Sequence, residues 1–299
     1  MTAQPEVIPQ LAGWHGPAAL HPFYVCDVFT PTPLQGNQLG VFTDGRAFRP
    51  AEMQRLAREL NFAETVFLFP PHHQADARMR IFTPRAELPF AGHPVLGTAF
   101  VVAAALGADR VLLETGAGVV PVALQREAGR LSFGWMQQQV PKWAPFGRER
   151  ELLAALGVES SLLPAEQYVN GPPHVYIELA SEAAVAALRP DMDAIAALEV
   201  PVNCYAGAGL RWKTRMFYPA AGVPEDPATG SAAGPLAVHL ARHGRISYGD
   251  QIQIRQGDEI GRPSVLHAKA TGVGDRIDSV EVGGAAVIVA AGQYRTTLN

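Results

Sequence analysis

The sequence predicts an α+β fold built from two similar domains, and three observations carry this prediction. Short apolar runs separated by Gly and Pro are typical of strands over much of the chain. Each half also contains one apolar helical stretch, 95–106 in the first and part of 228–244 in the second. A strand–loop–helix pattern occurs twice, which indicates a duplicated domain.

The first half opens with expected strands at 24–29 and 39–42. Pro50, at a first helical position and followed by apolar residues at helical spacing, predicts an amphipathic helix that ends near Asn61. The continuous apolarity of 95–106 requires a helix buried on nearly all sides. The remaining strands expected in this half are 65–69, 78–83, 111–113, 119–124 and 131–135.

A polar, Pro-containing break near 136–145 predicts a domain boundary. We expect a loose N-terminal extension at 1–21, an N-terminal domain at 22–135 and a C-terminal domain at 136–286, while the last strand, about 287–299, could join the first domain. The helices expected in the second half are 148–156, 182–188 and one within 228–244, and its strands are 175–179, 211–218, 252–254, 265–271 and 280–291.

Composition excludes several classes of protein. The net charge of −4 gives no basic excess for a nucleic-acid partner. The apolar run 94–108, which has no charged residue or His, falls short of the roughly 20 residues that span a membrane. The start of the chain lacks the features of a secretory signal, so we expect a cytoplasmic protein. Cys26 and Cys204 are far apart and form no CxxC, so we expect buried thiols and no metal site.

The repeated motif suggests where a ligand binds. Arg80-Ile-Phe-Thr-Pro is followed by His93-Pro-Val-Leu-Gly-Thr-Ala, and Arg215-Met-Phe-Tyr-Pro is followed by Asp226-Pro-Ala-Thr-Gly-Ser-Ala. We expect His93 and Asp226 near the N-caps of two helices, with Pro at the first helical position and Gly with Thr or Ser in the first turn. Free N–H groups and the helix dipole favour an anion there. A small carboxylated molecule held between His93 and Asp226 is the expected ligand, and simple helix capping or close packing is the alternative.

Four stretches, 27–42, 53–68, 80–99 and 222–240, together resemble the PhzF-like family of phenazine biosynthesis. The resemblance runs in order over most of the chain from about residue 22. It implies a fold similar to that of diaminopimelate epimerase, in which each domain wraps a barrel-like, mostly antiparallel sheet around a central helix. It further implies an active site between the domains, no cofactor and a homodimer.

The resemblance also implies roles for single residues. Asn61-Phe-Ala-Glu64-Thr-Val-Phe67 matches the family segment whose glutamate moves a proton between carbons of the substrate. Apolar neighbours would desolvate Glu64 and raise its pKa toward the working pH. His93 and Asp226 carry over as catalytic partners, and the residues expected to bind substrate are Gly92, Gly230, Ser231 and Asn37. Ala63 and Gln38 depart from the pattern, since many members have Ser and Pro there.

The expected function is therefore a cofactor-independent isomerase acting on a small carboxylated metabolite. The best-known reaction of the family isomerises trans-2,3-dihydro-3-hydroxyanthranilate. Two alternatives stay open: an epimerase or racemase of an amino-acid-like compound, and a carboxylate-binding protein without catalysis. The epimerase relatives use two facing cysteines, and the corresponding places here are expected to hold His93 and Asp226. A Glu64 carboxylate pointing into the cleft near these two residues would favour an enzyme.

Overall fold

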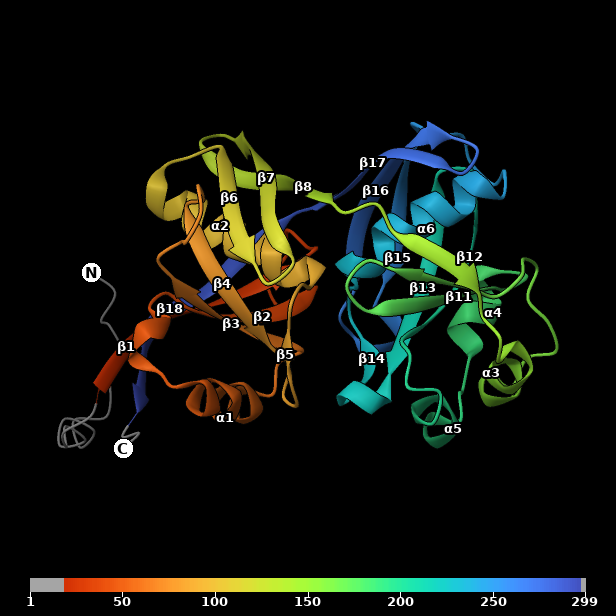
Figure 1. The fold of residues 1–299 in the computed structure, drawn as a ribbon, viewed down its shortest axis with the longest axis horizontal. Helices are drawn as coiled ribbons and strands as arrows, with labels where there is room; N and C mark the ends of the chain where they lie inside the picture. Colours follow the sequence, from red (N-terminus) through yellow and green to blue (C-terminus); the bar gives the residue numbers. More distant parts are fainter. Residues whose placement is uncertain (1–18, 297–299) are drawn as a thin grey trace, which may run out of the picture.

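The computed structural model describes residues 19–296, which form eighteen strands and six α-helices in two halves that lie side by side (Figure 1). The elements of the first half are β1 (Ala19–Val28), β2 (Asn37–Phe42), α1 (Pro50–Leu60), β3 (Glu64–Phe69), β4 (Ala77–Phe82), β5 (Glu87–Leu88), α2 (Gly92–Leu106), β6 (Arg110–Thr115), β7 (Gly118–Glu127) and β8 (Arg130–Gln138). The elements that follow are β9 (Lys142–Pro145), α3 (Glu149–Leu156), β10 (Glu166–Val169), β11 (Pro173–Glu178), α4 (Glu182–Ala187), α5 (Met192–Ala196), β12 (Val202–Ala208), β13 (Arg211–Tyr218), β14 (Val223–Asp226), α6 (Gly230–Arg242), β15 (Gln251–Gln256), β16 (Ser264–Val273), β17 (Arg276–Gly284) and β18 (Ala286–Thr296).

The two halves have the same strand order. In the first, hydrogen-bonded neighbours run β18-β1-β2-β3-β4-β6-β7-β8. In the second they run β9-β10-β11-β12-β13-β15-β16-β17. The parallel pairs also correspond, β2/β3 and β4/β6 in one half and β11/β12 and β13/β15 in the other. This correspondence confirms the two pseudo-symmetric, mostly antiparallel sheets.

One buried helix fills the centre of each sheet (Figure 1). The first twelve residues of α2, Gly92 to Ala103, are all buried. The first eleven residues of α6, Gly230 to Leu240, are buried as well. A helix with this little exposed surface needs apolar side chains all round, which confirms the prediction made from the apolarity of 95–106.

The chain crosses between the halves twice. It leaves the first half from β8 into β9 and returns from β17 into β18, where β18 pairs with β1. Strands β8 and β17 pair with each other and join the two sheets. The expected single strand at 280–291 is therefore wrong, because it is divided at Ala285. The chain passes close to Phe29 at Gly284, where a side chain would not fit. A Cβ on Gly284 would lie 2.4 Å from the Phe29 ring.

The expected N-terminal extension needs a correction at its end. Ala19 pairs with Thr296, and His21 pairs with Tyr294, so both belong to strand β1. The His21 imidazole also hydrogen-bonds Thr296 Oγ1 at 2.9 Å, which attaches this part of the chain to β18. The rest of the expected extension, 1–18, lies outside the described residues.

The repeated Arg and Phe of the motif have the same structural role in both halves. Arg80 on β4 pairs with Glu87 on β5, and Arg215 on β13 pairs with Glu225 on β14, each through two hydrogen bonds of 2.6–2.9 Å. Each guanidinium also lies over the Phe two residues later, at 5.2 Å and 5.0 Å from the ring centroid. The repeat thus fixes the short strand that leads toward each central helix.

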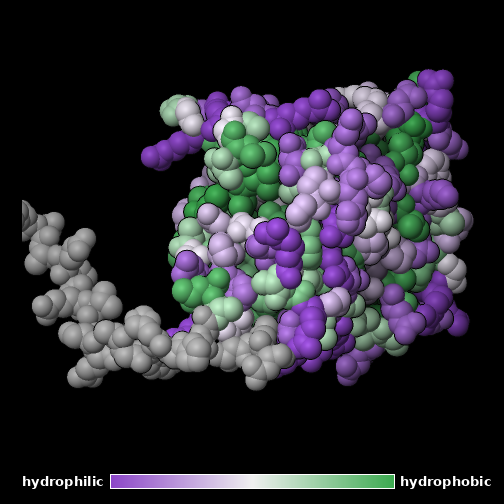
Figure 2. Space-filling view, turned by 60° about the vertical axis from the view of Figure 1, so that its left-hand side comes forward, coloured by the Kyte–Doolittle hydropathy of each residue, from purple (hydrophilic) through white to green (hydrophobic). Residues whose placement is uncertain are grey.

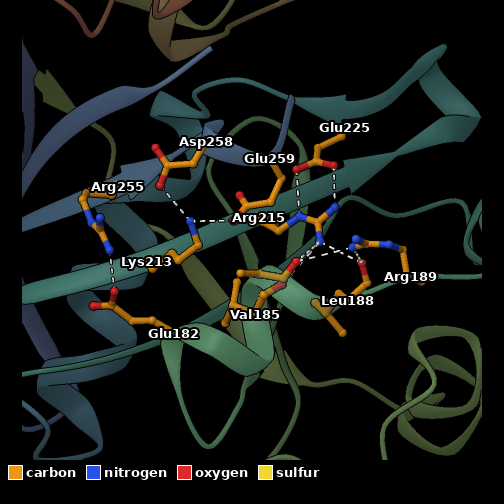
Figure 3. A network of polar contacts seen from close by, with 11 residues as sticks. Glu182, Val185, Leu188, Arg189, Lys213, Arg215, Glu225, Arg255, Asp258 and Glu259 are labelled. Carbon is orange, nitrogen blue, oxygen red and sulfur yellow. Dashed lines mark hydrogen bonds and ion pairs between the residues drawn. The ribbon is translucent and has the colours of Figure 1, made fainter. Parts of the chain in front are cut away.

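The second Arg is held more extensively than the first. Arg215 also donates to the carbonyl oxygens of Leu188, at 2.9 Å, and Val185, at 3.3 Å, near the end of α4 (Figure 3). Beside it on β13, Lys213 pairs with Asp258 and Glu259, both at 2.8 Å (Figure 3). These two buried cations therefore hold β13 to neighbouring segments through ion pairs and hydrogen bonds.

The surface of the described residues is mixed in character. Figure 2 shows one face on which hydrophilic and apolar side chains are interspersed. The large exposed apolar residues come from many separate elements, from Leu20 to Val273, and single exposed residues of this kind are ordinary. Across residues 19–296, the helices are too short or too polar to cross a membrane. Cys26 and Cys204 are fully buried, as expected.

Candidate active site

A cavity of about 420 Å³ lies between the two halves and receives residues from both. The two central helices begin at its wall and touch there. A Cβ on Gly92 would lie 2.5 Å from the backbone carbon of Gly230 and 2.6 Å from the Ser231 nitrogen. The residues that line the cavity are Glu64, Thr83, Arg85, Ala86, Leu88, Pro89, Phe90, Ala91, Gly92, His93, Gly171, Pro172, Pro173, His174, Met216, Tyr218, Ala220, Ala221, Val223, Asp226, Thr229, Gly230 and Ser231.

Glu64 begins β3 at the edge of this cavity. Asn61 ends α1 in the left-handed conformation, with φ of 53°, and a short turn then leads into the strand. Asn adopts this conformation more readily than most residues, which accounts for its place before the glutamate. The Glu64 side chain is 13% exposed. Burial, followed by the nearby charge of Asp226, raises its pKa well above the ordinary value.

His93 faces Glu64 directly. It is the second residue of α2, and its Nε2 lies 3.3 Å from Glu64 Oε2. Within the described part of the chain, neither of these two buried atoms has a hydrogen-bond partner. Burial lowers the pKa of His93 to about 3, so the imidazole is neutral. Two unsatisfied polar atoms that face a cavity are free to contact a ligand.

Asp226, the last residue of β14, is the third member of the group formed with Glu64 and His93. Its carboxylate accepts hydrogen bonds from Asn37 Nδ2 at 2.8 Å and from Thr229 Oγ1 at 2.6 Å. Burial raises its pKa to about 6 although both hydrogen bonds act in the opposite direction. Glu64 and Asp226 thus form an interacting pair of carboxyl groups with raised pKa values, which is typical of acid/base sites.

Asn37 was expected to bind substrate, but the structure places it behind the cavity wall. Its amide Nδ2 donates to Asp226 and to the Ala228 carbonyl, at 3.0 Å, and lies 3.2 Å from His93 Nδ1. It is 1% exposed and is not among the lining residues. Asn37 therefore orients His93 and Asp226 relative to each other across the two halves.

The other expected site residues, Gly92, Gly230 and Ser231, line the cavity, but the expected helix starts are wrong. α2 begins at Gly92 and α6 at Gly230, so His93 lies inside one helix while Asp226 lies four residues before the other. Pro227 accordingly precedes its helix.

Gly97 is a packing residue in the interior of α2, since a Cβ added to it would lie 2.7 Å from both Leu39 and Val28. An anion could approach Gly92 and Gly230, but not Gly97.

The strand register leaves Glu64 without an acidic counterpart. Thr65 lies opposite Phe82 on β4, and Val202 lies opposite the equivalent Phe217 on β13. The position equivalent to Glu64 is therefore Pro201, one residue before Val202. A single acid/base group needs no counterpart, so this asymmetry agrees with the role that the resemblance implies for Glu64.

His174 and Asn203 also belong to this site, although no motif in the sequence pointed to them. His174, on β11, lines the cavity, and its Nε2 lies 2.9 Å from Ser231 Oγ. Asn203, on the neighbouring strand β12, places its Nδ2 3.2 Å from His174 Nδ1. A polar His and Asn at buried positions of mostly apolar strands are the signal that could have drawn attention to them.

Among the described residues, one cluster has the spacing of metal ligands. Its members Glu166, His239 and His243 offer ligand atoms within 4.8 Å of one another, away from the cavity. The guanidinium of Arg242 already supplies a cation there, 2.9 Å from Glu166 Oε2, and lies 4.2 Å from the Trp143 ring centroid. The cluster therefore joins α6 to β10 through hydrogen bonds and ion pairs.

Comparison with known proteins decides the family. The family model for phenazine biosynthesis-like proteins, PhzC-PhzF, matches residues 26–292. The chain belongs to this family. Within the PhzC-PhzF group, the trans-2,3-dihydro-3-hydroxyanthranilate isomerase of Pseudomonas aeruginosa is 52% identical over 92% of this chain and 99% of its own.

Solved structures agree on the fold. A PhzF family protein from Bacillus anthracis superposes with a TM-score of 0.81 at 24% identity, over 92% of this chain and 99% of its own. A hydroxyproline epimerase from Agrobacterium vitis gives a TM-score of 0.66 at 13% identity, over 94% and 93%. The PhzC-PhzF chain therefore has the epimerase-like fold that its sequence predicted.

The raised pKa of Asp226 predicts a pH-dependent cost to stability. Below pH 3.8 the carboxyl is protonated in both the folded and the unfolded chain, and above about 6 it is charged in both. As the pH rises between these values the unfolded chain loses its proton first, so the folded state loses stability. We therefore compare the unfolding free energy of Asp226→Asn with that of wild type at each pH. This difference should rise by about 2 kcal/mol in favour of the variant from pH 4 to pH 8. Denaturant titrations at both pH values measure this, with the exposed Asp193→Asn as baseline, and an unchanged difference would contradict it.

Proposed function

We propose that this chain is a cofactor-independent isomerase of trans-2,3-dihydro-3-hydroxyanthranilate, with Glu64 as the base. The observation that carries the proposal is the Glu64 carboxylate in the cavity, 3.3 Å from His93 and beside Asp226. Relatives of that name from three Pseudomonas species, between 48% and 52% identical over at least 91% of this chain, support the choice of substrate.

The proposed step moves one proton. Two double bonds of this substrate ring are conjugated with its carboxylate, so removal of a hydrogen from the adjoining ring carbon delocalises charge onto the carboxylate oxygens. Glu64 takes that proton, holds it because burial favours its neutral form, and returns it to another ring carbon. His93 and Asp226 assist by relaying or polarising.

The substrate carboxylate is placed at the helix ends in this proposal. Gly92, Gly230 and Ser231 line the cavity at the starts of the two central helices, where N–H groups and two helix dipoles favour negative charge. Donors aimed at charge that grows during reaction lower the barrier more than they tighten binding.

The two alternative functions are less well supported. Racemisation by facing cysteines would need thiols in the cavity, whereas Cys26 and Cys204 are fully buried outside its lining, and burial raises the pKa of Cys26 to about 12. A binding protein without catalysis would not need a desolvated carboxyl directed at a neutral imidazole.

Incubation with trans-2,3-dihydro-3-hydroxyanthranilate in deuterated water tests the function. We expect a product isomeric with the substrate, with deuterium incorporated at carbon to the extent that the proton on Glu64 exchanges with solvent. Proton NMR and mass spectrometry follow both, without added metal or cofactor. Recovery of unchanged substrate with no exchanged carbon position, from enzyme that binds it, would refute the isomerase.

The proposal also covers assembly and location. We propose a homodimer, as the family resemblance implies, and we propose that it acts in the cytoplasm. Light scattering on the purified protein should then give twice the chain mass of 32.0 kDa. A mass equal to that of a single chain would contradict the dimer.

A further inference from the structure

Three buried side chains form a line from the second sheet to the cavity. Asn203 on β12, His174 on β11 and Ser231 in the first turn of α6 are 2%, 1% and 6% exposed. Asn203 Nδ2 lies 3.2 Å from His174 Nδ1, and His174 Nε2 lies 2.9 Å from Ser231 Oγ. A Ser–His–Asn series of this kind could serve two opposite purposes, since the imidazole can accept the serine proton or donate to its oxygen.

The position of the Asn203 amide decides between these purposes. Besides His174, its Nδ2 lies 3.3 Å from the backbone oxygen of Val175. A carbonyl oxygen only accepts hydrogen bonds, so the NH₂ group of the amide must face it, and the reversed amide would bring two oxygens together. The same NH₂ group therefore faces His174 Nδ1, which must be the unprotonated, accepting nitrogen.

This arrangement places the ring proton on the other nitrogen. Burial lowers the pKa of His174 to about 3, so the ring is neutral and carries one proton. With Nδ1 accepting, that proton is on Nε2, and His174 donates it to Ser231 Oγ. Among the described residues, Ser231 Oγ has no other hydrogen-bond partner. Its own hydrogen is consequently available to the cavity.

We propose that Asn203 and His174 are positioning residues that hold Ser231 as a hydrogen-bond donor toward the substrate carboxylate. The inference rests on the proposed function, and it adds the reason why this end of the cavity selects an anion. It also explains why the series is not a nucleophilic one, because a histidine that donates to the serine cannot take its proton.

The tautomer of His174 is the first test, and it needs no turnover. Nitrogen NMR of histidine-labelled protein distinguishes a protonated Nε2 from a protonated Nδ1, and the signal missing from His174→Gln identifies the residue. We expect the Nε2–H form in wild type at pH 7. In Asn203→Asp the carboxylate accepts from Nδ1, so the proton should move to that nitrogen. A wild-type ring protonated on Nδ1, or on both nitrogens, would overturn the proposal.

The second test measures binding of 3-hydroxyanthranilate, the aromatic analogue of the proposed substrate, by calorimetry. Ser231→Ala should weaken binding roughly ten- to a hundredfold, the range for a hydrogen bond to a charged group. His174→Leu should cause a similar loss. His174→Gln, which keeps an N–H donor, should recover most of the affinity. The control ligand 2-aminophenol lacks the carboxylate and should bind all variants alike.

The double variant Asn203→Asp/Ser231→Ala distinguishes a positioning role of Asn203 from a merely structural one. In the Asn203→Asp background the serine hydrogen turns toward His174, so Ser231→Ala should cost little further affinity. An equal loss in both backgrounds would overturn the proposal. If wild type shows the expected tautomer but binds no 3-hydroxyanthranilate, the proposed substrate fails while the orientation of Ser231 stands.

Discussion

Glu64→Gln is expected to lower the turnover of trans-2,3-dihydro-3-hydroxyanthranilate by 10²- to 10⁴-fold, the usual cost of losing a general base. The amide has nearly the same shape as the carboxyl, and the wild-type group is already biased toward its neutral form by burial. The fold and the binding of substrate should therefore survive. Steady-state kinetics should show the loss in kcat, with KM changed little.

A matched variant controls for the loss of charge. Glu59 lies five residues earlier, near the end of α1, and is exposed. Glu59→Gln should keep wild-type turnover. If Glu64→Gln also kept wild-type turnover, Glu64 would not be the base. If both variants lost activity equally, the cause would be the structure of this segment and not its chemistry.

Local sequence patterns predicted the helices whose apolar residues mark the surface that they bury. The amphipathic helix after Pro50 ends at Asn61 as expected, and the apolar stretch 95–106 is the buried helix α2. Strand β14 (Val223–Asp226) was missed because Pro224 and two acidic residues are typical of a turn. Its pairing with β13 involves two positions, Met216 and Tyr218, so tertiary contacts and not propensity make it a strand.

The division between β17 and β18 has a different cause. The stretch from Val280 to Ala291 contains Gly283-Gly284, a pair that marks turns, but the apolar residues on both sides favour one continuous strand. The strand ends there because the next residues must pair with β1, far away in the sequence. A change of pairing partner leaves no local signature.

The candidate site was predictable only where sequence carried a motif. Glu64, His93 and Asp226 meet as expected, but the residue pattern shared by the two motifs from His93 and Asp226 onward suggested equivalent helix starts. Gly92 follows Phe82 by ten positions, whereas Gly230 follows Phe217 by thirteen, so the motifs begin at different points of their helices. His174 and Asn203 belong to no motif, and their roles arise from the neighbouring strands β11 and β12.

The repeated arginines predict a second large effect, on stability. Arg215→Met should lower the free energy of unfolding by about 3–5 kcal/mol, the cost of removing one partner from a buried ion pair. The Arg215 and Glu225 side chains are 7% and 11% exposed, and the carbonyls of Leu188 and Val185 would also lose their donor. Denaturant titration measures the difference.

Arg80→Met is the matched control, because the same motif places it on the equivalent strand. Its side chain and that of Glu87 are 24% and 42% exposed, so water can replace the lost partner and the cost should be at most about 1 kcal/mol. Adding Glu225→Leu to Arg215→Met should recover part of the stability, since it removes the unpaired buried charge. Equal losses from the two single variants would show that the pairs act through backbone geometry shared by the repeat, and not through the burial of charge at Arg215.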